Sequence, residues 1–312
     1  MKRAALLRVF PLWSTPVVSV VSFVSCLAIA ASASAQMYES VGIRAQGMAG
    51  AFVAVADDST ATWWNPAGLA TGPYFDVLAE YGDPDVVSGQ RILGVALAMP
   101  AFGVSYYRLP ISEMRLALPI GNDPSNRQDQ GYLSQFGATF GQSVGHVVLA
   151  STVKVLHAGD DTHVDLDLGA MATLGRLKAG ISLRNLHETD YNVPGAAPVS
   201  LKRIARAGVS FTGAPGGVEL TAAADADLTT VTTVTGDVRH IAGGVEAWIW
   251  KRIIGVRGGL SEEIEHSVNS HSGGLSLMVL SGRYLHTYVD GQWTGGSDSI
   301  RRGWGVDLRL TF

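Results

Sequence analysis

Three things are scarce in this chain: charge, cysteine and long apolar runs. Of its 312 residues, 16% are charged and 47% are hydrophobic. Beyond residue 36, no segment approaches the ~20 consecutive apolar residues that a transmembrane helix requires. The single cysteine, Cys26, excludes an internal disulfide and a cysteine metal cluster. These absences leave two classes, a soluble domain with few charges or a β-barrel that crosses a membrane with strands.

The first 35 residues have the organisation of a secretory signal peptide. A basic start with Lys2 and Arg3 precedes an apolar centre over residues 17–31, and Ala33-Ser34-Ala35 offers an A-x-A cleavage site. An uncleaved membrane anchor and lipidation at Cys26 are the alternatives. The chain stays apolar for several residues past Cys26, which favours cleavage after Ala35. We therefore predict that residues 1–35 are a cleaved signal peptide and that the protein is exported.

The rest of the chain is acidic and carries no catalytic motif. Three of the 23 Lys and Arg residues lie in the predicted signal. The rest of the chain therefore has 20 basic residues and 27 Asp and Glu residues, which gives a net charge of −7. This balance disfavours nucleic acid as a partner. A P-loop, a dinucleotide fingerprint and a Ser/His/Asp set are all missing. We therefore predict that the protein is not an enzyme and has no cofactor.

From about Tyr74 onward, apolar and polar residues alternate along segments of roughly ten residues. The clearest segment is "VELTAAADADL", residues 218–228, in which Glu219, Asp225 and Asp227 share one face. Successive side chains of a strand point to opposite faces, so each segment has one apolar and one polar face. Strands are predicted over residues 73–82, 90–98, 101–109, 131–141, 146–156, 163–174, 177–187, 203–212, 217–228, 238–249, 252–260, 271–280, 283–293 and 302–312.

The connections between these strands alternate in length, with short turns such as "PA" and "GR" followed mostly by longer polar loops. This alternation is typical of outer-membrane barrels and favours a transmembrane antiparallel β-barrel of about 14 strands over a β-sandwich. An even number of strands places the end of the last strand in the periplasm. The aromatic Phe312 there predicts recognition by the barrel-assembly machinery. Four tryptophans near strand ends are predicted to form interfacial girdles: Trp248, Trp250, Trp293 and Trp304.

If the apolar faces meet outer-membrane lipid, the polar faces line the lumen. The predicted lumen charges are Asp165, Asp167, Lys178, Arg184, Arg206, Asp225, Asp227, Arg257, Asp307 and Arg309. A narrow interior with both signs favours a lattice of ion pairs, and a selective polar path is the alternative. The paired acids lack the histidines or turn glycine of a metal site, so no metal is predicted. His266 and His271 are placed in a solvated loop.

The segment before the first strand, residues 36–72, does not alternate and is rich in small residues. Gly47 and Gly50 allow close packing or a positive φ. Asp57, Asp58 or Ser59 is predicted to cap a short helix. The segment is therefore expected to fold as a compact plug with helical turns.

The second half of this segment, "TATWWNPAGLA", contains a break between two helical turns. Asn65 is predicted to cap the second turn, with Pro66 at its first position, where the missing N–H costs nothing. Gly68 is expected to end that turn. Trp63 and Trp64 are its large packing groups.

The run "GMAGAFVAVADDSTATWWNPAGLA" followed by strands resembles the start of the FadL-type long-chain fatty-acid transporter superfamily of outer-membrane barrels. It is most similar to the PorV/PorQ-like branch associated with type IX secretion. The matching residues are Gly47, Gly50, Ala51, Ala56, Asp57, Asp58, Asn65, Pro66, Ala67 and Gly68. The resemblance implies a 14-stranded barrel, residues 73–312, with residues 36–72 as a hatch inside it.

The resemblance implies passive uptake of a hydrophobic small molecule through a path gated by the hatch. The chain is shorter than typical transporters, and only the loop over residues 110–130 is apolar enough to capture a ligand. The candidate capture residues there are Ile111, Met114, Leu116, Leu118 and Ile120. The second hypothesis is a plugged, non-conducting barrel that docks or shuttles a secreted or surface protein. The substrate, the protein partner and the oligomeric state do not follow from the sequence.

Overall fold

The computed structural model describes residues 41–83, 91–110, 132–191, 199–233, 236–265, 268–296 and 302–312. All of them belong to one unit, Ser34–Phe312. The predicted signal peptide, its cleavage site and the predicted capture residues Ile111 to Ile120 lie outside the described residues.

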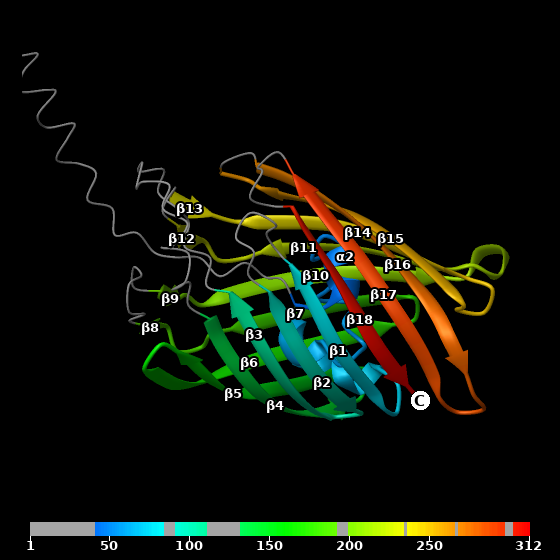
Figure 1. The fold of residues 1–312 in the computed structure, drawn as a ribbon, viewed down its shortest axis with the longest axis horizontal. Coiled ribbons are helices and arrows are strands. Elements are labelled where there is room, and N and C mark those ends of the chain that lie inside the picture. Colours follow the sequence, from blue (N-terminus) through cyan, green and yellow to red (C-terminus); the bar gives the residue numbers. More distant parts are fainter. Residues whose placement is uncertain are drawn as a thin grey trace, which may run out of the picture. The chain divides into compact units, whose positions relative to one another are not determined.

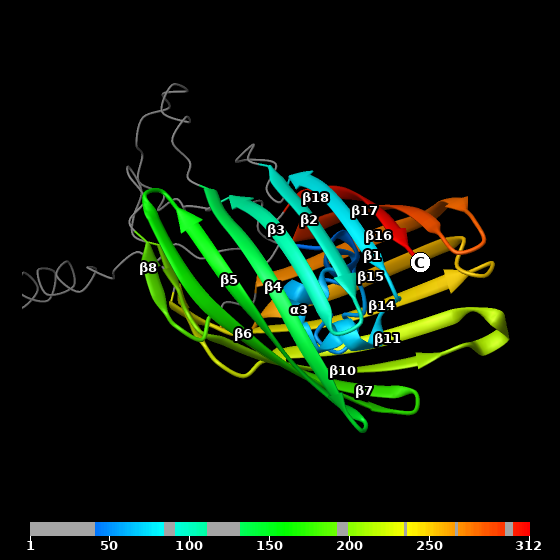
Figure 2. The ribbon, with the colours of Figure 1, turned by 90° about the horizontal axis from the view of Figure 1, so that it is seen from below.

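Fourteen antiparallel strands close into a barrel, because the first strand pairs with both the second and the last. Figures 1 and 2 show the ring of strands from two sides. The barrel strands are β1 (Asp76–Asp83), β2 (Ile92–Met99), β3 (Phe102–Pro110), β4 (Tyr132–Val144), β5 (Val147–Ala158), β6 (Asp161–Leu174), β7 (Leu177–Arg184), β10 (Ile204–Gly213), β11 (Glu219–Asp227), β14 (His240–Ile249), β15 (Ile254–Glu263), β16 (Val268–Ser281), β17 (His286–Gly296) and β18 (Gly303–Thr311). The predicted fold class is confirmed, and each predicted strand overlaps one of these.

Two small hairpins extend the connections at one end of the barrel. They are formed by β8 (Thr189–Tyr191) with β9 (Val199–Leu201) and by β12 (Val231–Thr233) with β13 (Gly236–Val238). Both lie between barrel strands whose connections were predicted to be long loops. A short 3₁₀ helix, η3 (Pro215–Gly217), forms the turn between β10 and β11 at the other end.

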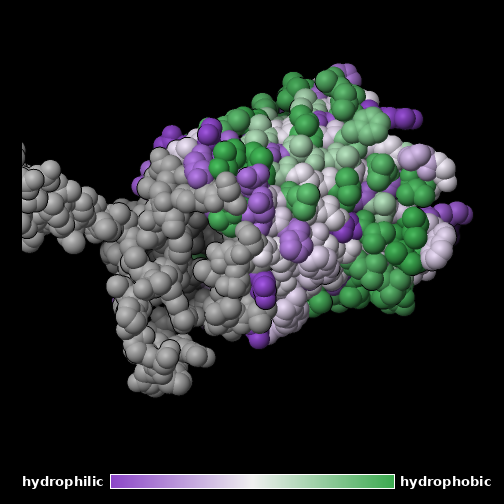
Figure 3. All heavy atoms as spheres, turned by 90° about the horizontal axis from the view of Figure 1, so that it is seen from above, coloured by the Kyte–Doolittle hydropathy of each residue, from purple (hydrophilic) through white to green (hydrophobic). Residues whose placement is uncertain are grey.

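Residues that alternate along each strand sequence point alternately to the inside and to the outside of the barrel wall. On β2, Leu93 and Val95 are exposed while Ile92 and Ala96 are buried toward the lumen. Figure 3 shows broad apolar areas on the visible outer surface. Such an outer face suits contact with hydrocarbon, whereas a water-facing wall would place polar side chains outward. Among the described residues, none of the helices is long and apolar enough to cross a membrane.

One predicted loop is largely strand. The segment "SEEIEHSVNS" was expected to connect two strands, but β15 extends to Glu263 and β16 begins at Val268. His271 therefore lies within β16, where its ring packs edge-on against Trp293, with 5.6 Å between the ring centroids. The prediction was wrong because the alternating pattern continues into this polar stretch, and pairing between neighbouring strands outweighs its low β-propensity.

Of the four tryptophans predicted to form the aromatic girdles, three are exposed and one is not. Trp250, Trp293 and Trp304 are exposed, with relative exposures of 67%, 55% and 40%. Trp248 is buried, and its ring contacts the ring of Tyr288 inside the barrel. The cause is strand parity, because Trp248 lies two residues after the inward-facing Glu246 and so shares its face.

Residues 41–72, here called the inner segment, lie within the ring of strands (Figures 1 and 2). The segment contains α2 (Ile43–Gly47), α3 (Ala61–Trp64) and η1 (Pro66–Thr71). Helix α2 contacts β15 to β18, whereas α3 and η1 contact the wall formed by β2 to β6. In the closed order of the barrel, β16 and β17 lie opposite β5 and β6, while β2 and β18 both neighbour β1. The inner segment therefore spans the lumen from one wall to the other.

Candidate functional site

The backbone of the inner segment is held by carboxylates of the barrel wall. One oxygen of Asp225 accepts hydrogen bonds from the backbone N–H groups of Phe52 and Val53, both at 2.7 Å. On the opposite side, Glu80 accepts from the N–H of Gly42 at 2.8 Å. Buried N–H groups outside regular structure need such partners. The wall charges therefore satisfy the irregular backbone of the segment and set its position.

The Asn65-Pro66 break forms as predicted. The side chain of Asn65 accepts a hydrogen bond from the N–H of Ala67 at 3.2 Å, and Pro66 occupies the first position of η1. The amide nitrogen of Asn65 also donates to the carbonyl of Val53 at 2.9 Å and to that of Ala170 on β6 at 3.3 Å. One side chain thus caps a helix, ties two parts of the inner segment together and fastens both to the wall.

The predicted cap of helix α3 is wrong in detail. Its N-cap residue is Thr60, whose side chain caps nothing. Instead, Asp58 accepts hydrogen bonds from the N–H and the hydroxyl of Thr60. The helix is only four residues long, and Asp58 stabilises the turn that precedes it. Asp57, the other candidate cap, pairs with Arg44 instead.

Gly68 does not end the second turn, as was predicted. The 3₁₀ helix η1 runs through it to Thr71, and Gly72 is the C-cap. A Cβ atom built at Gly68 would lie 1.8 Å from the carbonyl oxygen of Ala56. No side chain larger than hydrogen fits there, so Gly68 allows two parts of the inner segment to pack in direct backbone contact.

Of the other two glycines predicted for the plug, Gly47 lies at a close approach and Gly50 has a positive φ. A Cβ at Gly47 would be 2.6 Å from the side chain of Arg257 on β15. Gly50 adopts φ +81°, a conformation that side chains rarely tolerate, and lies beside Trp64. Both glycines allow the chain after α2 to fit against its neighbours.

On the β14–β18 wall the inner segment is held by ion pairs centred on Arg44. This buried arginine contacts both oxygens of Glu246 on β14, at 2.8 and 2.6 Å. It also pairs with Asp57 at 2.5 Å and Asp58 at 3.2 Å. Burial by itself lowers the pKa of Arg44, but the carboxylates of Asp57 and Glu246 raise it well above its usual value. Two-point contact of this kind fixes orientation as well as distance.

The same network continues along the wall. Arg257 lies 3.7 Å from Glu246 and 3.1 Å from Asp290, and Arg309 lies 3.5 Å from the other oxygen of Asp290. Arg309 also reaches Asp58 of the inner segment at 3.9 Å. All of these side chains are buried. A chain of alternating charges therefore joins the inner segment to β14, β15, β17 and β18.

A second ionic group lies on the far side of the lumen. Lys154 on β5 is fully buried and contacts Asp167 at 2.6 Å, Asp165 at 3.5 Å and the side-chain oxygen of Asn185 at 2.6 Å. A buried ammonium group needs such partners, because its desolvation is otherwise costly. This group consists of wall residues only and does not contact the inner segment through an ion pair.

The predicted lumen charges are mostly where the alternation placed them. Asp165, Asp167, Arg184, Arg206, Asp225, Asp227, Arg257, Asp307 and Arg309 are buried or nearly so, and Lys178 is half-buried. Only some of them come together. Arg257 and Arg309 belong to the network around Arg44, Arg206 pairs with Asp227 at 2.6 Å, and Asp225 holds backbone.

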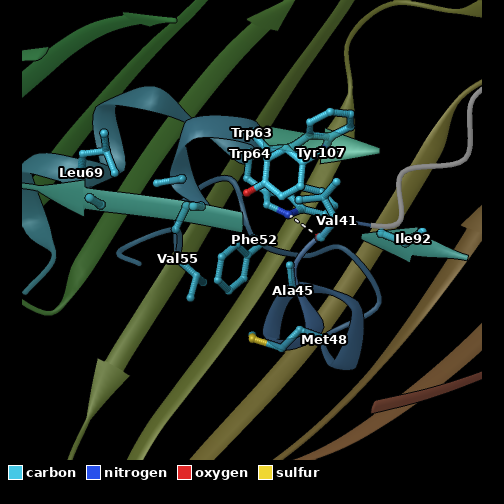
Figure 4. Close-up of a cluster of buried hydrophobic side chains, with 14 of the residues drawn as sticks. Val41, Ala45, Met48, Phe52, Val55, Trp63, Trp64, Leu69, Ile92 and Tyr107 are labelled. Carbon is cyan, nitrogen blue, oxygen red and sulfur yellow. Dashed lines mark hydrogen bonds between the residues drawn. The ribbon is translucent and has the colours of Figure 1, made fainter. Parts of the chain in front are cut away.

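On the β2–β6 wall the inner segment is held mainly by apolar packing, together with hydrogen bonds to Ala170 and Thr152. Trp63 is fully buried, and its ring meets that of Tyr107 on β3 edge-on, with 5.7 Å between centroids (Figure 4). The guanidinium of Arg184 lies 4.0 Å from the centre of the Trp63 ring. Trp64 packs against Phe52, and its Nε1–H donates to the carbonyl of residue 41 at 3.0 Å.

These side chains belong to a continuous buried apolar cluster, which we call the apolar seam. It includes Leu109 near the end of β3, Tyr107, Trp63, Leu69 of η1 and Ala98 at the opposite end of β2. The turn after Ala98 lies at the barrel end that holds Phe312, because Asp76 pairs with both Ala98 and Thr311. We call this barrel end, with its short connections, the turn end, and the opposite end, where residues 111–131 follow β3, the loop end. The apolar seam therefore extends along one wall from the loop end to the turn end.

Sequence reasoning missed Arg44, Tyr107 and Gln135, the last of which is buried on β4 directly opposite Tyr107. A signal existed for Arg44, which is the only basic residue between residues 36 and 90. A lone cation in a segment with Asp57 and Asp58 predicts a buried ion pair. For Tyr107 and Gln135 the alternation shows only that they face inward, which is true of many residues in a barrel.

The fold is similar to that of two solved proteins. A Pseudomonas aeruginosa FadL homologue superimposes with a TM-score of 0.55 at 12% identity, covering 88% of this chain and 99% of that chain. The Ralstonia pickettii toluene transporter TbuX gives a TM-score of 0.57 at 11% identity, covering 87% and 97%. No family model and no curated protein matches the sequence. At these identities the likeness concerns the fold alone.

Proposed function

We propose that the protein lets a hydrophobic small molecule cross the outer membrane by passive diffusion, with the inner segment as the gate. The observation that carries this proposal is the apolar seam, which extends from Leu109 at the loop end, past Trp63, to Ala98 at the turn end. Beside the ionic contacts of Lys154 on β5 and of Arg44 on the β14–β18 side, the seam offers a continuous apolar route.

The gate follows from how the inner segment is held. Its contacts with β2–β6 are mainly apolar, and apolar contacts are non-directional and can be replaced by those of an apolar ligand. Its contacts with β14–β18 are directional ion pairs, which cannot. We therefore infer that a ligand displaces α3 and η1 from the β2–β6 wall while α2 stays fixed through Arg44.

The two structures in the comparison support this class of function, since one is a FadL homologue and the other is described as a toluene transporter. Substrate identity does not follow from a shared fold. The proposal is therefore limited to apolar small molecules.

The ion-pair network also favours a second function. A segment held by Arg44, Glu246 and the neighbouring charges could remain in place permanently, leaving a plugged barrel that docks or shuttles a secreted or surface protein, as in the PorV-like hypothesis. The buried, closed character of this network is the specific observation in its favour. It predicts that apolar molecules do not enter, whether or not the seam is weakened.

The test measures how fast N-phenyl-1-naphthylamine enters cells that carry the protein in their outer membrane. Entry is monitored by the fluorescence of this dye, which rises in apolar surroundings. The channel predicts faster entry than in cells with an empty vector, and faster still after Trp63→Ala, which opens the seam. The matched control is Trp293→Ala, a change on the outer face of the barrel. Entry at the empty-vector rate for both the wild type and Trp63→Ala would refute the channel and support the plugged barrel.

A further inference from the structure

Three buried polar groups around the ring of Tyr107, and the hydroxyl of Tyr107 itself, have no hydrogen-bond partner in the part of the chain that the structure describes. The three groups are both amide atoms of Gln135 on β4, the hydroxyl of Ser105 on β3 and the Nε1–H of Trp63. The three residues have relative exposures of 1%, 3% and 0%. Nearly all buried polar side chains in proteins are paired, because an unpaired one costs about 1–3 kcal/mol. Unpaired atoms also occur in the ionic network, for example on Arg257 and Asp307, but these three groups are neutral and lie together.

The strand register brings the three groups around one aromatic ring. Gln135 lies directly opposite Tyr107 across β3 and β4, and Ser105 is two residues from Tyr107 on the same face. The Trp63 ring contacts the Tyr107 ring edge-on. Ser105 also points toward Gly137, two residues beyond Gln135, since a Cβ there would be 3.0 Å from its hydroxyl. The three groups therefore share the middle of the apolar seam.

Two direct neighbours of Gln135 are apolar, although charged side chains lie close by: Glu80 beside Tyr107, and Lys154 two residues from Leu156 on the same face of β5. The neighbour of Gln135 on the same face of β4 is Leu133, and across β5 it pairs with Leu156, both with a relative exposure of 1%. An amide in such a setting is a poor structural choice, because a leucine of similar volume would carry no desolvation cost. Its value lies in what it can bind.

We infer that Gln135, Ser105 and Trp63 recognise a neutral hydroxyl or carbonyl group on an otherwise apolar, preferably aromatic, molecule that moves along the seam. The amide and the hydroxyl each donate and accept, and the indole donates, so together they match a group that does both. None of the three carries a charge. The Tyr107 and Trp63 rings provide edges and faces for an aromatic body. This inference rests on the proposed channel function and narrows its substrate class.

The discriminating experiment compares two molecules that differ only in one hydroxyl group, 4-ethylphenol and ethylbenzene. Their binding to the purified full chain in detergent is measured by titration calorimetry. For the wild type we expect the phenol to bind about tenfold more tightly, roughly the contribution of one or two hydrogen bonds to a buried site. Partitioning into micelles is the same for every variant, so a change in this ratio reports on the protein alone.

Two variants and one control locate the recognition. Gln135→Leu should bring the ratio close to one, and Ser105→Ala should lower it part of the way. Thr139→Val is the matched control, because Thr139 is buried on the same strand but already paired with Thr152 at 2.8 Å. It should leave the ratio unchanged. Heat-modifiable migration on a gel shows that each variant is folded, and if Gln135→Leu does not fold, Ser105→Ala decides.

Several results would overturn the inference. They are an unchanged ratio in both variants, the absence of binding by either molecule, or tighter binding of 4-ethylbenzoate than of the phenol, which would assign the site to an anion paired with Arg184. The channel itself is tested separately, because entry of N-phenyl-1-naphthylamine does not require a hydroxyl group. Normal entry with an unchanged ratio would reject the recognition and keep the channel.

Discussion

The two walls that hold the inner segment use different physical interactions. At β14–β18, Arg44 is bound to Glu246 through two atoms and to Asp57 through a third contact, and the charges continue to Arg257 and beyond. At β2–β6, Trp63 and its neighbours pack without ion pairs to that wall. Ionic contacts fail abruptly when geometry is lost, whereas apolar contacts tolerate exchange of one partner for another. We therefore infer that the β14–β18 wall holds the inner segment in position and that a ligand passes along the β2–β6 wall.

The largest effect is expected from Arg44→Met, which breaks the ionic side. It leaves the buried Glu246 and the neighbouring Asp57 without their cation, a loss of about 3–5 kcal/mol for one partner of a buried pair. The inner segment should detach from β14–β18, and vesicles should leak small hydrophilic solutes. Thermal stability follows from the temperature at which gel migration changes. Arg252→Met is the control, because that arginine pairs with Glu219 on the exposed rim; an equal effect of both changes would contradict the assignment.

Trp63→Ala tests the apolar side and is expected to cost about 3–5 kcal/mol locally, through lost burial and the cavity left behind. The comparison predicts a different phenotype from that of Arg44→Met. Entry of N-phenyl-1-naphthylamine should rise, while leakage of hydrophilic solutes should stay low because the ionic side still holds α2. If both variants leak the same solutes to the same extent, the two walls do not have separate roles.

Gly68→Ala should destabilise the junction within the inner segment by about 1–3 kcal/mol, the usual range for overpacking. The added methyl would meet the backbone carbonyl of Ala56, which cannot move aside as a flexible side chain can. Gly291→Ala on β17 is the matched control, since a Cβ there would find nothing within 4 Å. Thermal melting followed by gel migration compares the two. Similar melting temperatures would show that the close approach is unimportant.

The smallest expected effect is the loss of the stabilising contribution of Asp57 at low pH. Burial opposes ionisation of Asp57, but Arg44 and Lys178 outweigh it and hold the pKa of Asp57 below its usual value. Its contribution is therefore fully present above the ordinary carboxyl pKa of about 4 and is lost as the pH falls from there through the lowered pKa. The difference in melting temperature between the wild type and Asp57→Asn should shrink when the pH is lowered from 7 to 3. A difference that grows toward low pH would contradict the pairing with Arg44.

Much of the barrel was predictable from the sequence because every second residue of a strand shares one environment, either the lumen or the outer surface. The segment at residues 218–228 shows this, with Asp225 and Asp227 buried on one face and Leu220 exposed on the other. The Asn65-Pro66 cap was equally predictable, since it depends on residues that are adjacent in the chain. The boundary of 36–72 as a gating hatch and the cleavage of residues 1–35 remain predictions.

The errors have a common origin. Gly68 was interpreted from its place in a helical turn, but its role is set by Ala56, twelve residues earlier in the chain. Trp248 was interpreted from its nearness to a strand end, but parity places it inside the barrel. The predicted ion pairs of the lumen are present, and what the sequence did not show is the apolar cluster around Tyr107 that lies beside them.

The sequence by itself determined the strand number, the closed barrel and which residues face inward, because alternation is a local property of extended chain. Only the tertiary structure decided that Arg44 meets Glu246, 202 positions away, and that Gln135 lies beside an apolar seam. The physical reason is that the alternation in a strand shows which side chains point inward. It does not show at what height in the lumen they lie or which side chains they contact. Both are set by the stagger of the strands and by the path of the inner segment across the lumen.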